Sequence, residues 1–139
     1  MKARVTWAGD LTFIGESNTG HAIAMSAGTD NGGRDTCIRP MEMVLVGMGG
    51  CTAIDVVSIL KKARQDVVDC EVLLDAERAT TTPAVFTAIK VHFVVTGRGL
   101  NADQVKRAVD LSAEKYCSVS IMLSKAVAIS HSFEVREAE

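Results

Sequence analysis

The thiol of Cys51 is the side chain in this sequence with the clearest potential for covalent chemistry. It follows Gly47, Gly49 and Gly50 in the stretch GMGGCTAID, inside an otherwise apolar segment. Each interior glycine weakens a helix by about 1 kcal/mol relative to alanine. These glycines therefore indicate either that another backbone comes very close or that the thiol needs exposure. An unpaired cysteine is also a common small core residue, and composition alone favours that structural interpretation.

The other three cysteines have less distinctive surroundings. Cys117 closes an amphipathic stretch beside Tyr116 and could equally be core filler. Cys70 falls on the inner face of an expected strand, which indicates a core residue, whereas Cys37 lies in a polar loop as an exposed thiol without an assigned task. The four cysteines have irregular spacing and form no CxxC pair. This spacing argues against a disulfide scaffold and against a zinc site.

Glu42 is the only charged residue between Arg39 and Asp55, at the start of an apolar helical pattern. A carboxylate there can simply be stabilised by the helix N-terminus, by about 0.3–1 kcal/mol. Alternatively, it holds a cation over a buried site, and Arg39 is the nearest candidate cation. Asp55 is interpreted as an ordinary helix charge turned to solvent or to Lys62.

The three histidines do not cluster in the sequence. His92 is expected on the polar side of its strand, and His21 and His131 fall on apolar faces, where a satisfied, half-buried histidine is common. No metal-binding set emerges from them. The glycine-rich stretch NGGRD lacks the strand and helix context of a phosphate-binding loop.

The elements that must position these residues follow an α+β order. Alternating residues broken by turn signals predict a meander of three strands over residues 1–27, followed by a polar loop over 28–39. Residues 40–63 predict a central helix that is apolar nearly all round and therefore buried on most sides. In residues 68–139 we expect two strands, a helix capped by Asn101 with an inner stripe ending at Tyr116, a short helical stretch after Cys117 and a last strand. The order βββ–α–ββ–α–β suits a single domain over residues 1–139.

Composition excludes several classes of protein. The 139 residues are 47% hydrophobic and 23% charged, with a net charge of −2 and scattered lysines and arginines. No basic surface for nucleic acid or for anionic membranes is expected. The charge-free stretch Met43–Ile54 is shorter than the roughly 18 residues of a membrane span, and the N-terminus lacks the apolar block of a signal peptide. We therefore expect a cytoplasmic protein.

Two long motifs, RPMEMVLVGMGGCTAIDVVSIL and AVDLSAEKYCSVSIML, resemble the OsmC/Ohr family, in particular its branch of OsmC-like redox proteins. The resemblance covers essentially the whole chain. It implies an OsmC-like fold in an intertwined homodimer, with two central helices packed together and two sites at the subunit interface. In such a dimer the three glycines would let a neighbouring backbone approach Cys51.

The resemblance also implies a hydroperoxide reductase that needs no cofactor and no metal. Relatives of this kind attack an organic hydroperoxide with a cysteine that matches Cys51 and resolve the product with one that matches Cys117. An arginine favours the thiolate and a carboxylate orients the arginine, and here Arg39 and Glu42 are the candidates. The implied partners are a second copy of the chain, the hydroperoxide and a dithiol reductant, for example of lipoyl type. Apolar lining by Met43, Met48 and Met122 would favour bulky alkyl hydroperoxides.

The sequence departs from the peroxidase pattern in two places. The peroxidases have an arginine in the turn after the first strand, where this chain has Gly9-Asp10-Leu11, and Arg34 lies in a different loop. Their glutamate falls at the position of Met41, and Glu42 is one residue closer to Cys51. Two alternatives therefore stay open: a thiol redox sensor or disulfide oxidoreductase without peroxidase turnover, and a non-enzymatic dimer that binds an apolar ligand.

Overall fold

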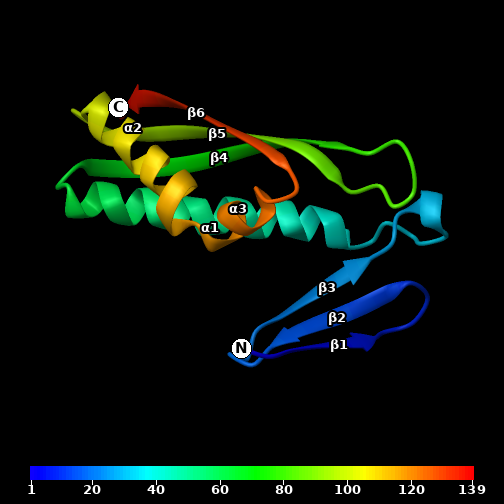
Figure 1. The fold of residues 1–139 in the computed structure, drawn as a ribbon. Helices are drawn as coiled ribbons and strands as arrows, with labels where there is room; N and C mark the ends of the chain where they lie inside the picture. The colour runs from blue at the N-terminus through cyan, green and yellow to red at the C-terminus, as the bar shows by residue number, and fades with distance from the viewer. The chain divides into compact units, whose positions relative to one another are not determined.

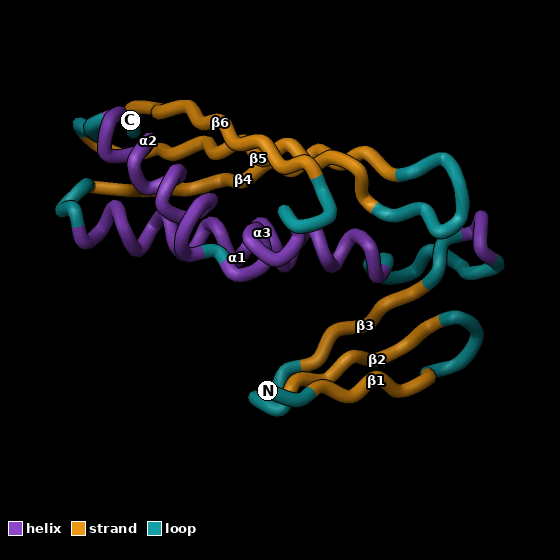
Figure 2. Tube along the Cα trace, in the orientation of Figure 1, coloured by secondary structure: helices purple, strands orange, loops and turns teal.

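The computed structural model describes all 139 residues and has the expected α+β order (Figure 1). Figure 2 shows three strands, one helix, two strands, two helices and a last strand along the chain. The elements are β1 Ala3–Trp7, β2 Thr12–Ser17, β3 Ala22–Ser26, α1 Pro40–Lys62, β4 Asp66–Arg78, β5 Phe86–Arg98, α2 Ala102–Leu111, α3 Ser118–Leu123 and β6 Ala128–Glu137. The helical stretch expected after Cys117 is α3. The predicted α+β class and the order of elements are confirmed.

The chain divides into two compact units, Met1–Val46 and Gly47–Glu139, and the division falls within α1. In the first unit, β1, β2 and β3 form an antiparallel three-stranded sheet. In the turn between β1 and β2, Gly9 and Asp10 both have positive φ, 98° and 45°. The loop over residues 28–39 contains a single 3₁₀ turn at Thr29–Asn31.

One face of the β1–β3 sheet is apolar and has little cover. Trp7 pairs with Phe13, which in turn pairs with Met25, so that these three residues share a face. Trp7 remains 67% exposed and Val5 60% exposed. A cavity of about 380 Å³ is lined by Val5, Leu11, Phe13, Met25, Ser26, Ala27 and Pro40. An apolar sheet face of this kind normally packs against something.

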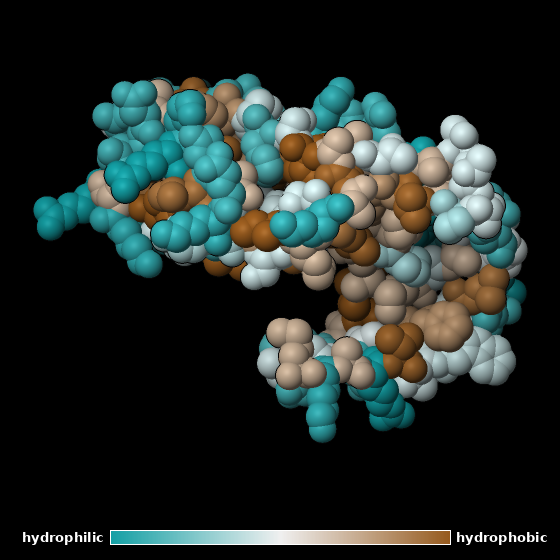
Figure 3. All heavy atoms as spheres, in the orientation of Figure 1, coloured by the Kyte–Doolittle hydropathy of each residue, from teal (hydrophilic) through white to brown (hydrophobic).

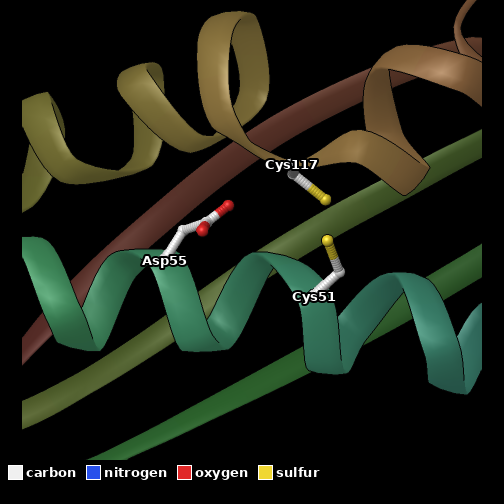
Figure 4. A group of neighbouring side chains, drawn as sticks. All are labelled: Cys51, Asp55 and Cys117. Carbon is white, nitrogen blue, oxygen red and sulfur yellow. The ribbon is translucent and has the colours of Figure 1, made fainter.

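The second unit contains the main core. Its sheet has the order β4-β5-β6, with β4 and β5 antiparallel and β5 and β6 parallel. The helical segments lie against the same face of this sheet (Figures 1 and 4). The central strand β5 supplies much of the buried apolar surface, namely Phe86, Ile89, Val91, Phe93, Val94 and Val95. The helices that position the candidate site therefore pack on the buried apolar face of this sheet.

Helix α1 buries only one stripe within a single chain. Met48, Thr52, Val56 and Leu60 follow one another at four-residue spacing, and each has no exposed surface. Ile54, between them in sequence, points elsewhere and is 69% exposed. The expectation of a helix buried on most sides is thus wrong for one chain, because the sheet covers only one side. Figure 3 shows apolar residues reaching the surface over the region of α1 and α3, with hydrophilic residues gathered over α2.

The glycines before Cys51 divide between these two faces. A Cβ on Gly49 would lie 2.8 Å from Cδ1 of Leu74, so this glycine allows close packing of α1 on β4. Gly47 and Gly50 have nothing within 4 Å of such a Cβ. Of these three glycines, only Gly49 packs so closely within one chain that a larger side chain would clash.

By length and composition α1 could also span a membrane. Its most apolar 18-residue stretch has a mean hydropathy of 2.0 and is 28% buried. The charge-free stretch Met43–Ile54 is shorter than the whole apolar helix, because α1 continues past Asp55 to Lys62. A core helix of a water-soluble protein meets the same criterion. The absence of a membrane partner remains a prediction.

Helix α2 begins as predicted, but the inner stripe ends early. The side chain of Asn101 accepts hydrogen bonds from the backbone N–H groups of Asp103 and Gln104. Residues Ser112–Tyr116 then form a π-helical turn. This wider turn rotates the chain, so that Ser112 is buried whereas Tyr116 is 49% exposed. The assignment of Tyr116 to the inner stripe was wrong for this reason.

Candidate functional site

Cys51 and Cys117 lie together in the structure, although 65 residues separate them in the sequence. Their sulfur atoms and a carboxylate oxygen of Asp55 all lie within 4.8 Å of one another. Figure 4 shows the two thiols pointing toward each other, Cys51 from α1 and Cys117 from the segment that precedes α3. Both cysteines are free thiols. The structure thus brings together the two thiols that the family resemblance paired.

Helix α1 places Cys51 and Asp55 on the same face. They are four residues apart, and residues at this spacing are neighbours on a helix surface. Asp55 was interpreted from the sequence as an ordinary charge. The four-residue spacing from Cys51 was the available signal, but it has no meaning until the helix face that meets Cys117 is known.

The π-helical turn positions Cys117. The backbone N–H of Cys117 donates a hydrogen bond to the carbonyl oxygen of Ser112 at 2.9 Å, and this bond closes the turn. Cys117 then adopts an extended backbone, with φ −71° and ψ 101°. Its sulfur accepts a hydrogen bond from the backbone N–H of Ser120 at 3.3 Å. These two bonds hold the sulfur in place facing α1.

The two thiols differ in accessibility. Cys117 has no exposed surface, whereas Cys51 is partly exposed. Burial raises the pKa of the Cys117 thiol, and its contact with Cys51 acts in the same direction, while the N–H of Ser120 opposes both. A thiol that is buried and holds its proton is a poor first nucleophile. Cys51 is therefore the better placed of the two to attack a substrate.

A hydrogen-bond chain links Asp55 to the interior. The hydroxyl of Ser112 donates to Oδ2 of Asp55 at 3.1 Å, and it lies 2.7 Å from the hydroxyl of Thr52. Thr52 and Ser112 are both fully buried. On its other side Asp55 borders a cavity of about 340 Å³, lined also by Ser58, Ile59, Lys62, Leu111 and Tyr116. The carboxylate is thus oriented from inside and open to solvent from outside.

Arg39 and Glu42 lie in the first unit and contact each other, though not through the guanidinium. Oε2 of Glu42 accepts a hydrogen bond from the backbone N–H of Arg39 at 2.9 Å. This is the contact expected of a carboxylate at a helix N-terminus. The guanidinium pairs instead with Asp35 at 3.1 Å and with Asp30 at 3.7 Å. The guanidinium of Arg39 is charged at all ordinary pH values, and the hydrogen bond to Asp35 raises its pKa further.

The remaining candidates lie outside the Cys51–Cys117 cluster. Cys37 is half-buried and not exposed as expected, because its backbone exchanges hydrogen bonds with the hydroxyl of Ser26. Cys70 is also half-buried, and desolvation raises its pKa. Arg34 pairs with Asp10 at 3.4 Å. Of the methionines expected to line the site, Met48 is fully buried and Met122 is 66% exposed.

Each histidine has a structural environment of its own. The ring of His131 stacks on Phe93 with 6.4 Å between centroids, its Nε2 has no partner, and burial lowers its pKa. His92 contacts Ser132 at 2.8 Å on the outer face. His21 is exposed, so its expected half-burial was wrong. None of the three joins the cysteines.

Residues 32–132 match the family model described as OsmC-like protein. The match contains both cysteines of the cluster and most of the fold. The chain belongs to the OsmC-like protein family. The predicted resemblance is confirmed.

Similar proteins agree with this assignment. Protein YhfA of Escherichia coli K12 is 61% identical over 135 residues, which cover 97% of this chain and 98% of that protein. The crystal structure of a hypothetical protein from Aquifex aeolicus VF5 has a TM-score of 0.88 at 30% identity and covers 99% of this chain and 97% of its own. The crystal structure of an organic hydroperoxide resistance protein OsmC from Legionella pneumophila has a TM-score of 0.71 at 16% identity. The match covers 96% of this chain and 95% of that protein's chain. The last comparison shows a shared OsmC-like fold.

Proposed function

We propose that this OsmC-like protein is a thiol-dependent redox protein that reduces organic hydroperoxides with Cys51 and Cys117. The single observation that carries this proposal is that the two thiols face each other, one partly exposed and one buried. Family membership supports a redox role related to peroxides, since one fold neighbour is described as an organic hydroperoxide resistance protein.

The proposed reaction has three steps. The thiolate of Cys51 attacks the peroxide oxygen, the O–O bond breaks, and the alkoxide leaves as an alcohol after it takes up a proton; Cys51 becomes a sulfenic acid. The sulfur of Cys117 then attacks the sulfenic sulfur, which forms a disulfide and releases water. An external dithiol reduces the disulfide by thiol–disulfide exchange and is itself oxidised. Cys117 must lose its proton in the second step, and its raised pKa opposes that loss.

The proposed active form is a homodimer. The apolar face of the β1–β3 sheet and the exposed face of α1 are both uncovered in one chain, as the exposures of Trp7 and Ile54 indicate. Gly47 and Gly50 on α1 leave room for a neighbouring backbone. A second copy would cover these surfaces and exclude water from Cys51. We assign the cation of this site to Arg39, positioned by Asp35 and Asp30, with Glu42 fixing its backbone.

A second candidate function is disulfide exchange without peroxidase turnover. The charged group that the structure places beside the thiols is the carboxylate of Asp55. A carboxylate does not stabilise charge on a departing oxygen, but it can accept a proton from a thiol. This arrangement favours a slower reaction with peroxide than a site with an adjacent arginine.

Single-turnover kinetics tests the proposal. Fully reduced protein is mixed with one equivalent of an alkyl hydroperoxide, and the loss of peroxide is followed. Cys51→Ser should abolish consumption, because a serine hydroxyl cannot form a sulfenic acid. Cys37→Ser, a matched change at another half-buried thiol, should react like the wild type. Equal rates in wild type and Cys51→Ser would remove the peroxidase function, and disulfide exchange with a dithiol would then be the function to measure.

A further inference from the structure

We propose that Cys51, Cys117 and Asp55 in the reduced protein form a binding site for one divalent zinc ion. The inference goes beyond peroxide reduction, because it requires the thiols only to be reduced and close together. The sequence spacing argued against zinc, since it contains neither a CxxC pair nor a cluster of histidines. The tertiary structure assembles a ligand set that no local spacing reveals.

The donor atoms have suitable identity and separation. Zinc binds cysteine sulfur at about 2.3 Å and carboxylate oxygen at about 2.0–2.2 Å, so two sulfur ligands of one ion lie within roughly 4.6 Å of each other. The two sulfurs and the Asp55 oxygen lie within 4.8 Å of one another. To share one ion, the three donor atoms have to move slightly closer together. Three protein ligands leave a fourth tetrahedral position for water.

The ligands also have the supporting contacts that metal sites require. Ser112 donates to the Asp55 carboxylate at 3.1 Å, and the backbone N–H of Ser120 donates to the Cys117 sulfur at 3.3 Å. Partners of this kind orient ligands and contribute to metal affinity. A cavity of about 340 Å³ borders Asp55 and gives this ligand access from solvent.

Charge and ligand softness favour zinc over other divalent cations. On binding, both thiols lose their protons to solvent, so one Zn²⁺ meets two thiolates and one carboxylate. Thiolates select zinc over magnesium and calcium, which prefer oxygen ligands. Because protons compete with the metal for the sulfurs, zinc affinity should rise with pH. A bound ion would also block the thiolate of Cys51.

The test is equilibrium zinc binding to the reduced full chain, measured by competition with a chromogenic zinc indicator under anaerobic conditions. Wild type should bind one zinc ion per chain. Loss of a hydrogen-bond partner outside the ligand set already lowers metal affinity roughly 10- to 100-fold, so Cys51→Ser, Cys117→Ser and Asp55→Asn should each lose at least about tenfold. Cys37→Ser and Cys70→Ser are the matched controls and should bind like wild type. Far-UV circular dichroism identifies variants that fail to fold.

Two further readouts separate this inference from the proposed peroxidase function. Cobalt(II) in place of zinc should give sulfur-to-metal charge-transfer absorption that weakens in each cysteine variant. Zinc should also slow alkylation of Cys51 in wild type, and a folded Asp55→Asn variant should need at least about tenfold more zinc for the same protection. Neither readout depends on peroxide turnover. The inference would be overturned if zinc stoichiometry were unchanged in folded Cys51→Ser and Cys117→Ser proteins, or if Asp55→Asn bound zinc as tightly as wild type.

Discussion

Ser112 donates a hydrogen bond to Asp55 at 3.1 Å and so ties the π-helical turn to the helix that carries Cys51. The same hydroxyl lies 2.7 Å from that of Thr52 in the fully buried core. The distance between the two thiols is therefore controlled by a polar contact between two helical segments and not only by apolar packing. This relationship makes Ser112 a positioning residue for the site.

Ser112→Ala should lower the free energy of unfolding by about 1–3 kcal/mol. The change leaves the buried hydroxyl of Thr52 without this partner, and an unsatisfied buried polar group costs about that much. Chemical denaturation of the reduced protein measures the change. Ser118→Ala, at an exposed position at the start of α3, is the matched control and should stay within about 0.5 kcal/mol of wild type. Equal midpoints for both variants would contradict a structural role for the Ser112 contact.

Cys51 and Cys117 should form a reversible disulfide within one chain. Their sulfurs face each other without an intervening residue, and Cys37 and Cys70 lie outside the cluster. Mass mapping after one equivalent of organic hydroperoxide should find the Cys51–Cys117 linkage. Cys117→Ser should consume one equivalent of peroxide and then stall as a sulfenic acid that a dimedone probe traps. A linkage through Cys37, or only over-oxidised Cys51, would count against the assignment.

Arg39→Met should slow the reaction of Cys51 with peroxide if the guanidinium contributes to the complete site. A permanent positive charge favours the thiolate and stabilises the departing oxygen. Glu42→Gln should have a milder effect in the same direction, because Glu42 holds only the backbone of Arg39. Arg34→Met is the control, since that arginine pairs with Asp10. Unchanged single-turnover rates in Arg39→Met would assign the cation elsewhere.

The protein should be a stable dimer at micromolar concentration. Ile54 and Trp7 are 69% and 67% exposed in one chain, which leaves large apolar surfaces uncovered. Sedimentation equilibrium should give twice the chain mass, and Ile54→Glu should shift the population toward monomer. Leu73→Glu places the same change on the outer face of β4, where Leu73 is 50% exposed, and should leave the dimer intact. A monomeric wild type would remove the shared-site proposal.

His131 should make stability depend on pH. Burial lowers its pKa from 6.5 in the folded chain, so the unfolded chain binds a proton more readily. This contribution to stability is complete above about pH 6.5 and is lost as the pH falls through the lower folded pKa. The free energy of unfolding, measured by chemical denaturation, should fall between about pH 7.5 and about pH 5. This fall should be smaller in His131→Phe than in wild type. His21→Phe, a change at an exposed histidine, is the control and should show the same fall in the free energy of unfolding as wild type.

The sequence by itself determined the class of fold, the order of its elements and the family. Local signals suffice for these features: alternation in β1 to β3, the Asn101 cap of α2 and the two long motifs. Each depends on neighbours within a few residues or on a pattern carried by the whole segment. The same local rules identified Cys51 as unusual through its glycines.

Only the tertiary structure decided which side chains meet. Asp55 looks like any helix charge until α1 packs on the sheet and turns the Cys51–Asp55 face toward the segment before α3. The π-helical turn exposes Tyr116 and aims Cys117 at α1. It includes a backbone hydrogen bond from Cys117 to Ser112 that no periodicity predicts. The burial of α1 on one side follows from the extent of the sheet beneath it. Such contacts arise between segments distant in sequence, where packing and not local preference sets the geometry.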